Sequence, residues 1–172
     1  KTEAVQDQLR HTINETRIRE FGLFDGADKA FFDTLADKVQ PHAYLPEQDV
    51  FGRLESAGSL YLIMQGQVGV LRKGETEPMI VLGEGEIFGE MALYFHTPRS
   101  ATIRTLDYCK FFELEYRHIR ALSARFPWFG LRLEEMATQR KQSNEIAQAA
   151  YEEAAGLQRS DLPTGEVAPT GQ

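Results

Sequence analysis

The chain has 172 residues, of which 42% are hydrophobic, and this size suits one domain with helical extensions and a proper core. Its formal net charge of −7 argues against a general nucleic-acid binder, because such a protein needs a basic surface to displace counterions. The single cysteine, Cys109, excludes an intrachain disulfide and predicts a reducing compartment.

The sequence shows neither a membrane span nor a signal peptide. No stretch approaches the roughly 18 consecutive apolar residues of a membrane-spanning helix. No charged and then apolar leader opens the chain. The first residue is Lys1 and not methionine, so we expect a piece of a longer protein.

Residues 1–39 read as connector and N-terminal helices. Residues 3 to about 20 are charged and helix-permissive, and they predict a connector helix. Val5, Leu9, Ile13 and Arg17 lie along one face, on which the apolar stripe is thin. A second helix should begin at an N-cap, either Asp25 or Asp28. Its apolar face would consist of Phe31, Phe32, Leu35 and Val39.

Residues 40–115 change to short runs rich in Val, Ile, Leu, Tyr and Phe, separated by Gly, Pro and acidic residues. About eight short strands with this spacing predict an antiparallel sandwich or barrel. Around Gly66, the alternating residues Leu62, Met64, Val68 and Val70 predict a hairpin with one buried face.

Residues 116–155 predict C-terminal helices. The first has Ile119 and Leu122 inward and is stopped by Pro127. The second is long, from Trp128 to about Ala155, and it carries Phe129, Leu133, Met136 and Arg140 on one face. Residues 156–172 have no periodicity and predict a disordered tail.

Enzyme and metal motifs are not found in the sequence. The glycines of "GEGEIFGE" are spaced G-x-G-x-x-x-G, one residue too long for the dinucleotide fingerprint. The four histidines are scattered singly, so we expect no metal centre; they are His11, His42, His96 and His118. Cys109 has no histidine near it in sequence and is most simply a core residue.

The segment "FGEMALYFHTPRSATI", residues 88–103, is the candidate site. Gly89 permits a tight turn, and residues 91–93 can form a helical turn whose backbone N–H groups would bind an anion. Arg99 can hold the same anion with two charge-assisted hydrogen bonds. Glu90 is only an acceptor when ionised and requires a hydroxyl donor. The segment therefore predicts a site for a phosphate attached to a ribose with a free 2′-hydroxyl.

These residues also resemble a known family. "FGEMAL", a five-residue loop and "RSATI" are similar to the phosphate-binding cassette of the cyclic nucleotide-binding domains. The surrounding "YLPE", "LYLIMQGQVGV" and "VLGEGEIFGE" agree, and the resemblance covers roughly residues 22 to 140. It implies an α+β fold: an eight-stranded antiparallel β-roll, jelly-roll-like, with flanking N-terminal helices and a long C-terminal lid helix.

The resemblance also implies roles for residues of segment 88–103, hereafter the cassette. Glu90 would bind the ribose 2′-hydroxyl and Arg99 the cyclic phosphate. The phosphate would also receive the backbone N–H groups of Gly89, Met91 and Ala92 and the hydroxyl of Ser100. In the family a threonine after the arginine favours cGMP and an alanine favours cAMP. Ser100 lies between the two, so we favour cAMP and keep cGMP as an alternative.

Arg140 has two interpretations. On the lid helix it could reach over the purine base by hydrogen bonding or stacking. The other interpretation is a solvated arginine on a long helix. The face that carries Leu133 and Met136 is more plainly one that packs against the roll.

Two positions depart from the family pattern. The family has glycines in the turn after "YLPE" and in a later turn, where this chain has Gln48 and Leu54. We expect both turns to be reshaped.

The end of the roll, "RTLDYCKFFELEYRHIRALSARFPWF", is similar to that of cyclic nucleotide-regulated channels. This resemblance implies a non-enzymatic cytoplasmic sensor, joined to a transmembrane pore or transport domain of the same longer chain. It also implies a homo-oligomer, which would be a tetramer in a channel, and no nucleic-acid partner. The alternatives are the regulatory domain of a non-channel cAMP effector and a degenerate interaction module that binds no nucleotide.

Overall fold

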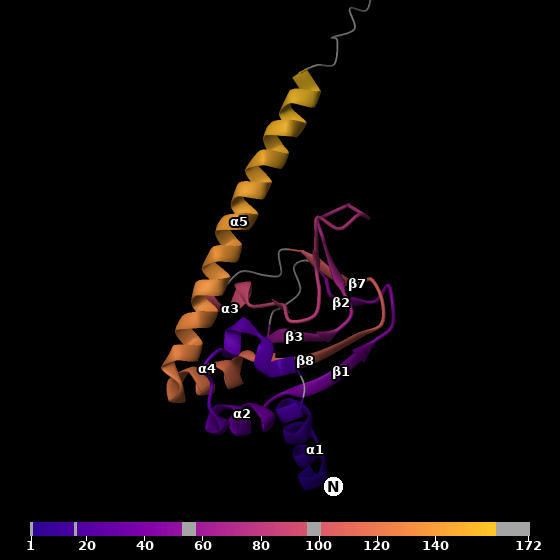
Figure 1. The fold of residues 1–172 in the computed structure, drawn as a ribbon. Helices are drawn as coiled ribbons and strands as arrows, with labels where there is room; N and C mark the ends of the chain where they lie inside the picture. The colour runs from indigo at the N-terminus through magenta and orange to yellow at the C-terminus, as the bar shows by residue number, and fades with distance from the viewer. Residues whose placement is uncertain (1, 16, 53–57, 96–100, 161–172) are drawn as a thin grey trace, which may run out of the picture. The chain divides into compact units, whose positions relative to one another are not determined.

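The structure is a computed structural model that describes residues 2–15, 17–52, 58–95 and 101–160 (Figure 1). The chain forms two compact units, Lys1–Ala137 and Thr138–Gln172, whose boundary falls within one long helix. The first unit holds all the strands and the helices that pack on them. The second holds the continuation of the long helix.

The described residues form helices and eight strands, as the α+β prediction requires. The helical elements are α1 Thr2–Glu15, the 3₁₀ segments η1 Arg17–Glu20 and η2 Gly22–Phe24, α2 Lys29–Ala36, α3 Met91–Phe95, α4 Tyr116–Arg125 and α5 Pro127–Ser160. The strands are β1 Gln40–Tyr44, β2 Asp49–Phe51, β3 Ser59–Gln65, β4 Val68–Leu71, β5 Ile80–Leu82, β6 Ile87–Phe88, β7 Thr102–Thr105 and β8 Cys109–Glu115.

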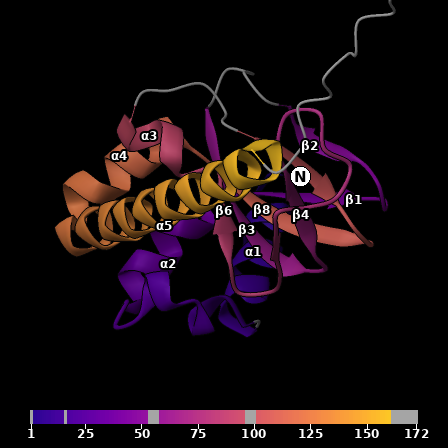
Figure 2. The same cartoon turned by 90° about the horizontal axis from the view of Figure 1, so that it is seen from above.

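The strands make two four-stranded antiparallel sheets, seen from above in Figure 2. Their orders are β1-β8-β3-β6 and β2-β7-β4-β5. The predicted hairpin around Gly66 is therefore wrong, because β3 and β4 belong to different sheets. Leu62 of β3 pairs with Phe112 of β8, whereas Val68 of β4 pairs with Thr105 of β7. Gly66 instead carries the chain from one sheet to the other, with a φ of 89° that suits glycine.

Strand β3 separates two hydrophobic cores. Leu60 and Leu62 point to the core shared with the helices, and Ile63 belongs to the core between the sheets. All three are fully buried. The strand is apolar on both faces because each face covers a core of its own, and this pattern replaces the simple alternation of a one-sided strand.

The N-terminal helices differ in part from the prediction. The first helix ends at Glu15, and Arg17–Glu20 continues as a 3₁₀ segment in which Ile18 is fully buried. The second helix, α2, begins where expected. The N-cap is Asp28, whose Oδ1 accepts the backbone N–H of Phe31 at 3.0 Å, while Asp25 closes η2 instead.

An aromatic cluster joins η2, α2 and the start of α5. The ring of Phe31 lies 5.6 Å from Phe24 of η2, 4.9 Å from Trp128 and 5.3 Å from Phe129 of α5 (centroid distances). Pro127 ends α4 as predicted and becomes the first residue of α5, where its missing N–H costs nothing. The helix then runs to Ser160, beyond the predicted end at Ala155.

Candidate functional site

The start of the cassette is a strand, a glycine turn and a short helix. Phe88 ends β6 in the core between the sheets, and Met91 begins α3. Between them, Gly89 has a φ of 91°, a backbone conformation that a residue with a Cβ rarely adopts. The backbone N–H of Leu93 then bonds to the carbonyl of Glu90 at 3.1 Å, which closes the first turn of α3. The sequence prediction of a turn followed by a helical turn is correct here.

Glu90 is the most distinctive residue of this turn. Its side chain is buried, with 1% of its surface exposed, although carboxylates are rarely buried in full. Removing a carboxylate from water is costly unless hydrogen-bond donors compensate it. A buried carboxylate at this point is therefore suited to receive donors from a bound molecule.

The predicted contact residues divide into three groups. Gly89, Glu90, Met91 and Ala92 are consecutive, and the structure brings them together at the start of α3. Arg99 and Ser100 lie outside the described residues, as does Leu54 of the second altered turn. Arg140 lies on α5 within the second unit, and its contact with a base stays a prediction.

Two tyrosines join the cassette to residues far along the chain, and sequence reasoning missed both. The hydroxyl of Tyr116, the first residue of α4, donates to the carbonyl of Gly89. The hydroxyl of Tyr94, on α3 itself, donates to the carbonyl of Gly130 on α5 at 3.3 Å. Burial, with a smaller contribution from Glu134, raises the pKa of Tyr94 to about 12, so this phenol keeps its proton. The cassette is thus joined by hydrogen bonds to both C-terminal helices.

An apolar row extends from the end of the cassette across three strands. Ile103 of β7 pairs with Val70 of β4, and Val70 pairs with Ile80 of β5. Ile103 and Val70 belong to the core between the sheets, while Ile80 is 37% exposed at the sheet edge. A flat apolar group held beside the cassette could pack on this row. The strand pairing that creates it is not visible in the sequence.

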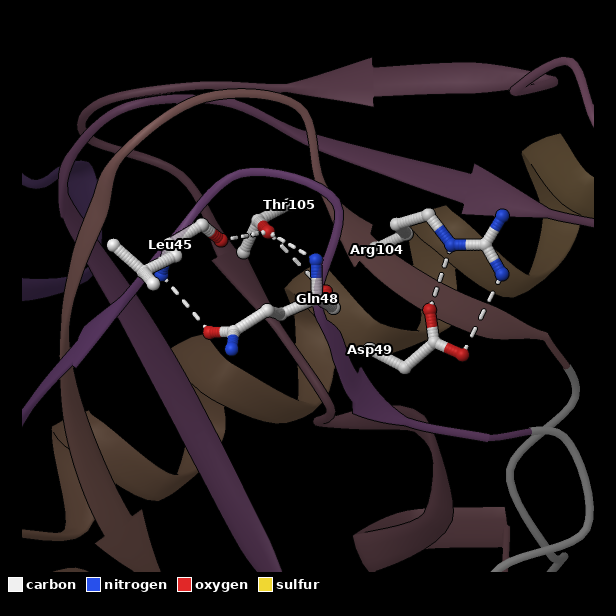
Figure 3. Close-up of polar contacts among 5 residues, drawn as sticks. All are labelled: Leu45, Gln48, Asp49, Arg104 and Thr105. Atoms are coloured by element: carbon white, nitrogen blue, oxygen red, sulfur yellow. Dashed lines mark hydrogen bonds and ion pairs between the residues drawn. The ribbon is translucent and has the colours of Figure 1, made fainter.

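The turn after "YLPE" is held by side chains, and its difference from the turn of the family stays a prediction. Glu47 takes a φ of 62°, the left-handed conformation that glycine adopts most easily. The side-chain Oε1 of Gln48 accepts the backbone N–H of Leu45 at 2.9 Å, and the backbone N–H of Gln48 donates to the hydroxyl of Thr105 at 2.9 Å (Figure 3). That hydroxyl donates to the carbonyl of Leu45 at 2.6 Å. Side-chain hydrogen bonds hold the turn, and strand β2 follows it directly.

An ion pair fixes the strands beyond this turn. Arg104 of β7 bonds through Nε to Oδ1 of Asp49 at 2.7 Å, and the two residues face each other in the register of β2 and β7 (Figure 3). This arginine is five residues beyond Arg99 and already has a partner. It is therefore useful as a control for Arg99.

The described residues were also searched for a metal-binding cluster and for a membrane-spanning helix. In the ranges that the structure describes, no three His, Cys, Asp or Glu side chains are grouped to hold a metal ion. Among the described helices, none is both long and apolar enough to cross a membrane. Cys109 is buried at the start of β8, as the core interpretation predicts.

The sequence is similar to a known domain family and to potassium-conducting channels. The family described as "Cyclic nucleotide-binding domain" matches residues 41–126, which are 86 of the 172 residues. The human potassium/sodium hyperpolarization-activated cyclic nucleotide-gated channel 3 is 26% identical over 140 residues, 81% of this chain and 18% of the channel. The rice (Oryza sativa subsp. japonica) potassium channel AKT2 is 29% identical over 100 residues, 56% of this chain and 12% of the channel.

Solved structures share the fold. The regulatory subunit of a cAMP-independent protein kinase A from Trypanosoma brucei superposes with a TM-score of 0.70 at 19% identity, over 84% of this chain and 50% of that one. The Thermus thermophilus catabolite activator protein superposes with a TM-score of 0.66 at 25% identity, over 76% and 62%. The chain spans less than a fifth of the two channels and less than two thirds of either structure. From the family match and the shared fold, this chain belongs to the cyclic nucleotide-binding domain family.

Proposed function

We propose that this chain is a sensor that binds cAMP, or alternatively cGMP, at the cassette. The observation that carries the proposal is the buried carboxylate of Glu90, placed after the left-handed Gly89 at the start of α3. Glu90 accepts a hydrogen bond from the ribose 2′-hydroxyl, because an ionised carboxylate needs a donor. Arg99 binds the cyclic phosphate, and bidentate charge-assisted hydrogen bonds suit a guanidinium for this task.

The remaining groups complete the pocket. The backbone N–H groups of Gly89, Met91 and Ala92 and the hydroxyl of Ser100 bind the phosphate. The purine base packs on the apolar row of Ile103, Val70 and Ile80, and a contact of Arg140 with the base stays a prediction. The row supports this placement because it starts at the last residue of the cassette.

The output is transmitted to another part of a longer chain. The two channel relatives support a cytoplasmic domain joined to a transmembrane pore or transport domain, in a homo-oligomer that would be a tetramer in a channel. A nucleotide that binds one conformation of the cassette and the C-terminal helices more tightly shifts the population toward that conformation. The difference in affinity sets the free energy available to the pore.

A calorimetric titration with cAMP and with cGMP tests the proposal. The three proteins are the wild-type chain, Arg99→Ala and the control Arg104→Ala, which removes a nearby arginine that is paired with Asp49. Truncating one partner of a hydrogen-bonded charge pair costs about 2 to 5 kcal/mol, so Arg99→Ala should weaken binding at least ~30-fold.

Arg104→Ala should bind within about fivefold of wild type, because an exposed ion pair contributes at most about 1 kcal/mol. The ratio of the cAMP and cGMP affinities decides the base preference. If neither nucleotide binds at millimolar concentration, or if both variants lose affinity equally, the sensor proposal is wrong. The interaction-module alternative would then be the better explanation.

A further inference from the structure

The peptide that joins Gly89 to Glu90 is held by a tyrosine from outside the cassette. The hydroxyl of Tyr116, the first residue of α4, donates to the carbonyl oxygen of Gly89. The side chain of Tyr116 is buried, with 6% of its surface exposed, in the core that the strands share with the helices. Its hydroxyl is therefore shielded from bulk water and bonded to one particular carbonyl. All three residues belong to the first unit.

Strand β3 brings the two ends of this hydrogen bond together, although they are 27 residues apart. It lies between β6 and β8 in its sheet, and Tyr61 of β3 pairs with Phe88 on one side and with Glu113 on the other. Gly89 follows Phe88 directly, and Tyr116 comes three residues after Glu113. Neighbouring strands lie about 4.8 Å apart, so the side chain of Tyr116 bridges from one neighbour of β3 to the other.

A glycine at position 89 leaves the orientation of the next peptide open unless a neighbour selects it. Gly89 has a φ of 91°, and glycine populates positive and negative φ about equally. Because a peptide unit is planar, rotation about the bonds on either side turns its carbonyl and N–H groups together. The backbone alone therefore does not select one orientation of the peptide between Gly89 and Glu90. The buried hydroxyl of Tyr116 selects one, because it donates to the carbonyl in only that orientation.

The orientation of this peptide determines where the carboxylate of Glu90 lies. The backbone of Glu90 is fixed on both sides, because the preceding carbonyl accepts the hydroxyl of Tyr116 and its own carbonyl accepts the N–H of Leu93 at 3.1 Å. A rotation of the peptide before Glu90 would displace its Cα and Cβ. Its side chain is 1% exposed, and close packing leaves a buried side chain little freedom to compensate with another rotamer. The carboxylate would therefore move with the peptide.

We propose that Tyr116 is a positioning residue of the nucleotide site, and that its hydroxyl sets the selectivity for ribose over 2′-deoxyribose. It holds the peptide between Gly89 and Glu90 in the orientation that presents the carboxylate to the 2′-hydroxyl. Tyr116 itself does not touch the nucleotide. The inference rests on the proposed function, since it names the residue that supports the ribose contact of that site.

Calorimetric titration with cAMP and with 2′-deoxy-cAMP tests this, because the second ligand lacks only the hydroxyl that Glu90 binds. The proteins are wild type, Tyr116→Phe, Glu90→Gln, their combination and the control Tyr44→Phe. Tyr116→Phe removes one hydroxyl and leaves the ring in the core. Tyr44→Phe removes the hydroxyl of another partly buried tyrosine, which lies on β1 and packs against Phe111 of β8.

Wild type should bind cAMP at least ~10-fold more tightly than 2′-deoxy-cAMP, the lower end of the effect of a hydrogen bond to a charged group. Tyr116→Phe should weaken the binding of cAMP at least ~5-fold and that of 2′-deoxy-cAMP less than ~2-fold, while Tyr44→Phe should change either less than ~2-fold. Adding Tyr116→Phe to Glu90→Gln should change the cAMP affinity less than ~2-fold, because both residues act through one contact. Tyr116→Met, which also lacks the hydroxyl, serves as a second variant if Tyr116→Phe does not fold, with the same loss of selectivity expected.

The ratio of the two affinities is a readout that a purely structural role would not move, because a destabilised fold weakens both ligands by the same factor. If wild type selects cAMP and Tyr116→Phe keeps that selectivity, or if its effect persists in Glu90→Gln, this inference is wrong and the proposed function stands. If wild type binds cAMP and 2′-deoxy-cAMP equally, the ribose contact of Glu90 is wrong and this inference fails with it. If wild type binds neither cAMP nor cGMP, the proposed function fails as a whole.

Discussion

Replacing Gly66 by alanine should destabilise the protein far more than the same change at Gly74. Both glycines have positive φ angles, 89° and 77°, so an alanine at either position has the same kind of backbone strain. Their surroundings differ. A Cβ at Gly74 meets nothing within 4 Å, whereas a Cβ at Gly66 would lie 2.5 Å from the carbonyl oxygen of Tyr108 and 2.7 Å from Sγ of Cys109.

The expected free energies follow from these two terms. The left-handed conformation costs an L-residue about 1 to 2 kcal/mol, and the less flexible unfolded chain returns part of this. Gly74→Ala should therefore lower the free energy of unfolding by about 1 kcal/mol. At Gly66 the crowding adds about 1 to 3 kcal/mol, the usual cost of overpacking, since a backbone carbonyl cannot rotate away as a side chain can.

Urea unfolding of the two variants and wild type, with linear extrapolation to water, measures both values. The difference between the variants isolates the crowding, because the backbone strain is common to them. We expect Gly66→Ala to be less stable than Gly74→Ala by about 1 to 3 kcal/mol. Equal losses within about 0.5 kcal/mol, a typical limit for independent effects, would refute the reasoning that Gly66 is required by its neighbours.

Three further predictions concern the cassette, the buried thiol and the altered turn. Gly89→Ala should weaken cAMP binding at least about tenfold, because it places ~1.4 kcal/mol of backbone strain next to the ligand. Gly85 has a similar φ of 87°, and Gly85→Ala should not weaken binding. Calorimetric titration of both variants with cAMP tests this. Burial, and then Asp107, raise the pKa of Cys109 from 9.0 to about 11, so the unfolded thiol ionises first as the pH rises. The free energy of unfolding should therefore fall between about pH 9 and 11, and fall less in Cys109→Ala; an equal fall in urea titrations of both would contradict the assignment. Glu47→Gly should raise the free energy of unfolding by up to about 1 kcal/mol, because glycine relieves the left-handed strain; a lower urea midpoint would show that the glutamate contributes in another way.

The local features of the fold were predictable from sequence because their signals are local. The N-cap Asp28, the apolar face with Phe31 and Leu35, and the break at Pro127 depend on residues within one or two helical turns. The sheet to which each strand belongs does not depend on such nearby residues. Val68 and Leu62 have the alternation of a hairpin, yet they pair with different strands, because alternation reports which face is buried and not which strand is next.

The same division applies to the candidate site. Gly89 and Glu90 were predicted because the cassette is continuous in sequence, and the structure adds the burial of the carboxylate. The tyrosines were missed because their partners are 27 and 36 residues away, and each is recognised only by where its hydroxyl ends.

The two-sided burial of β3 has a consequence for how the strand finds its alignment. In a strand with one polar face, a slip by one residue exposes apolar side chains to water, and this penalty fixes the pairing. This penalty is absent for the apolar residues of β3, which include Leu60, Leu62 and Ile63. A slip by one residue would exchange one apolar side chain for another on each face. The alignment must be set at the strand's end, where the pairing with β8 shifts between Ile63 and Gln65 and Gly66 makes its left-handed turn. Deleting a single residue there would exchange the occupants of both cores at once, while leaving the hydrophobic pattern of the strand unchanged.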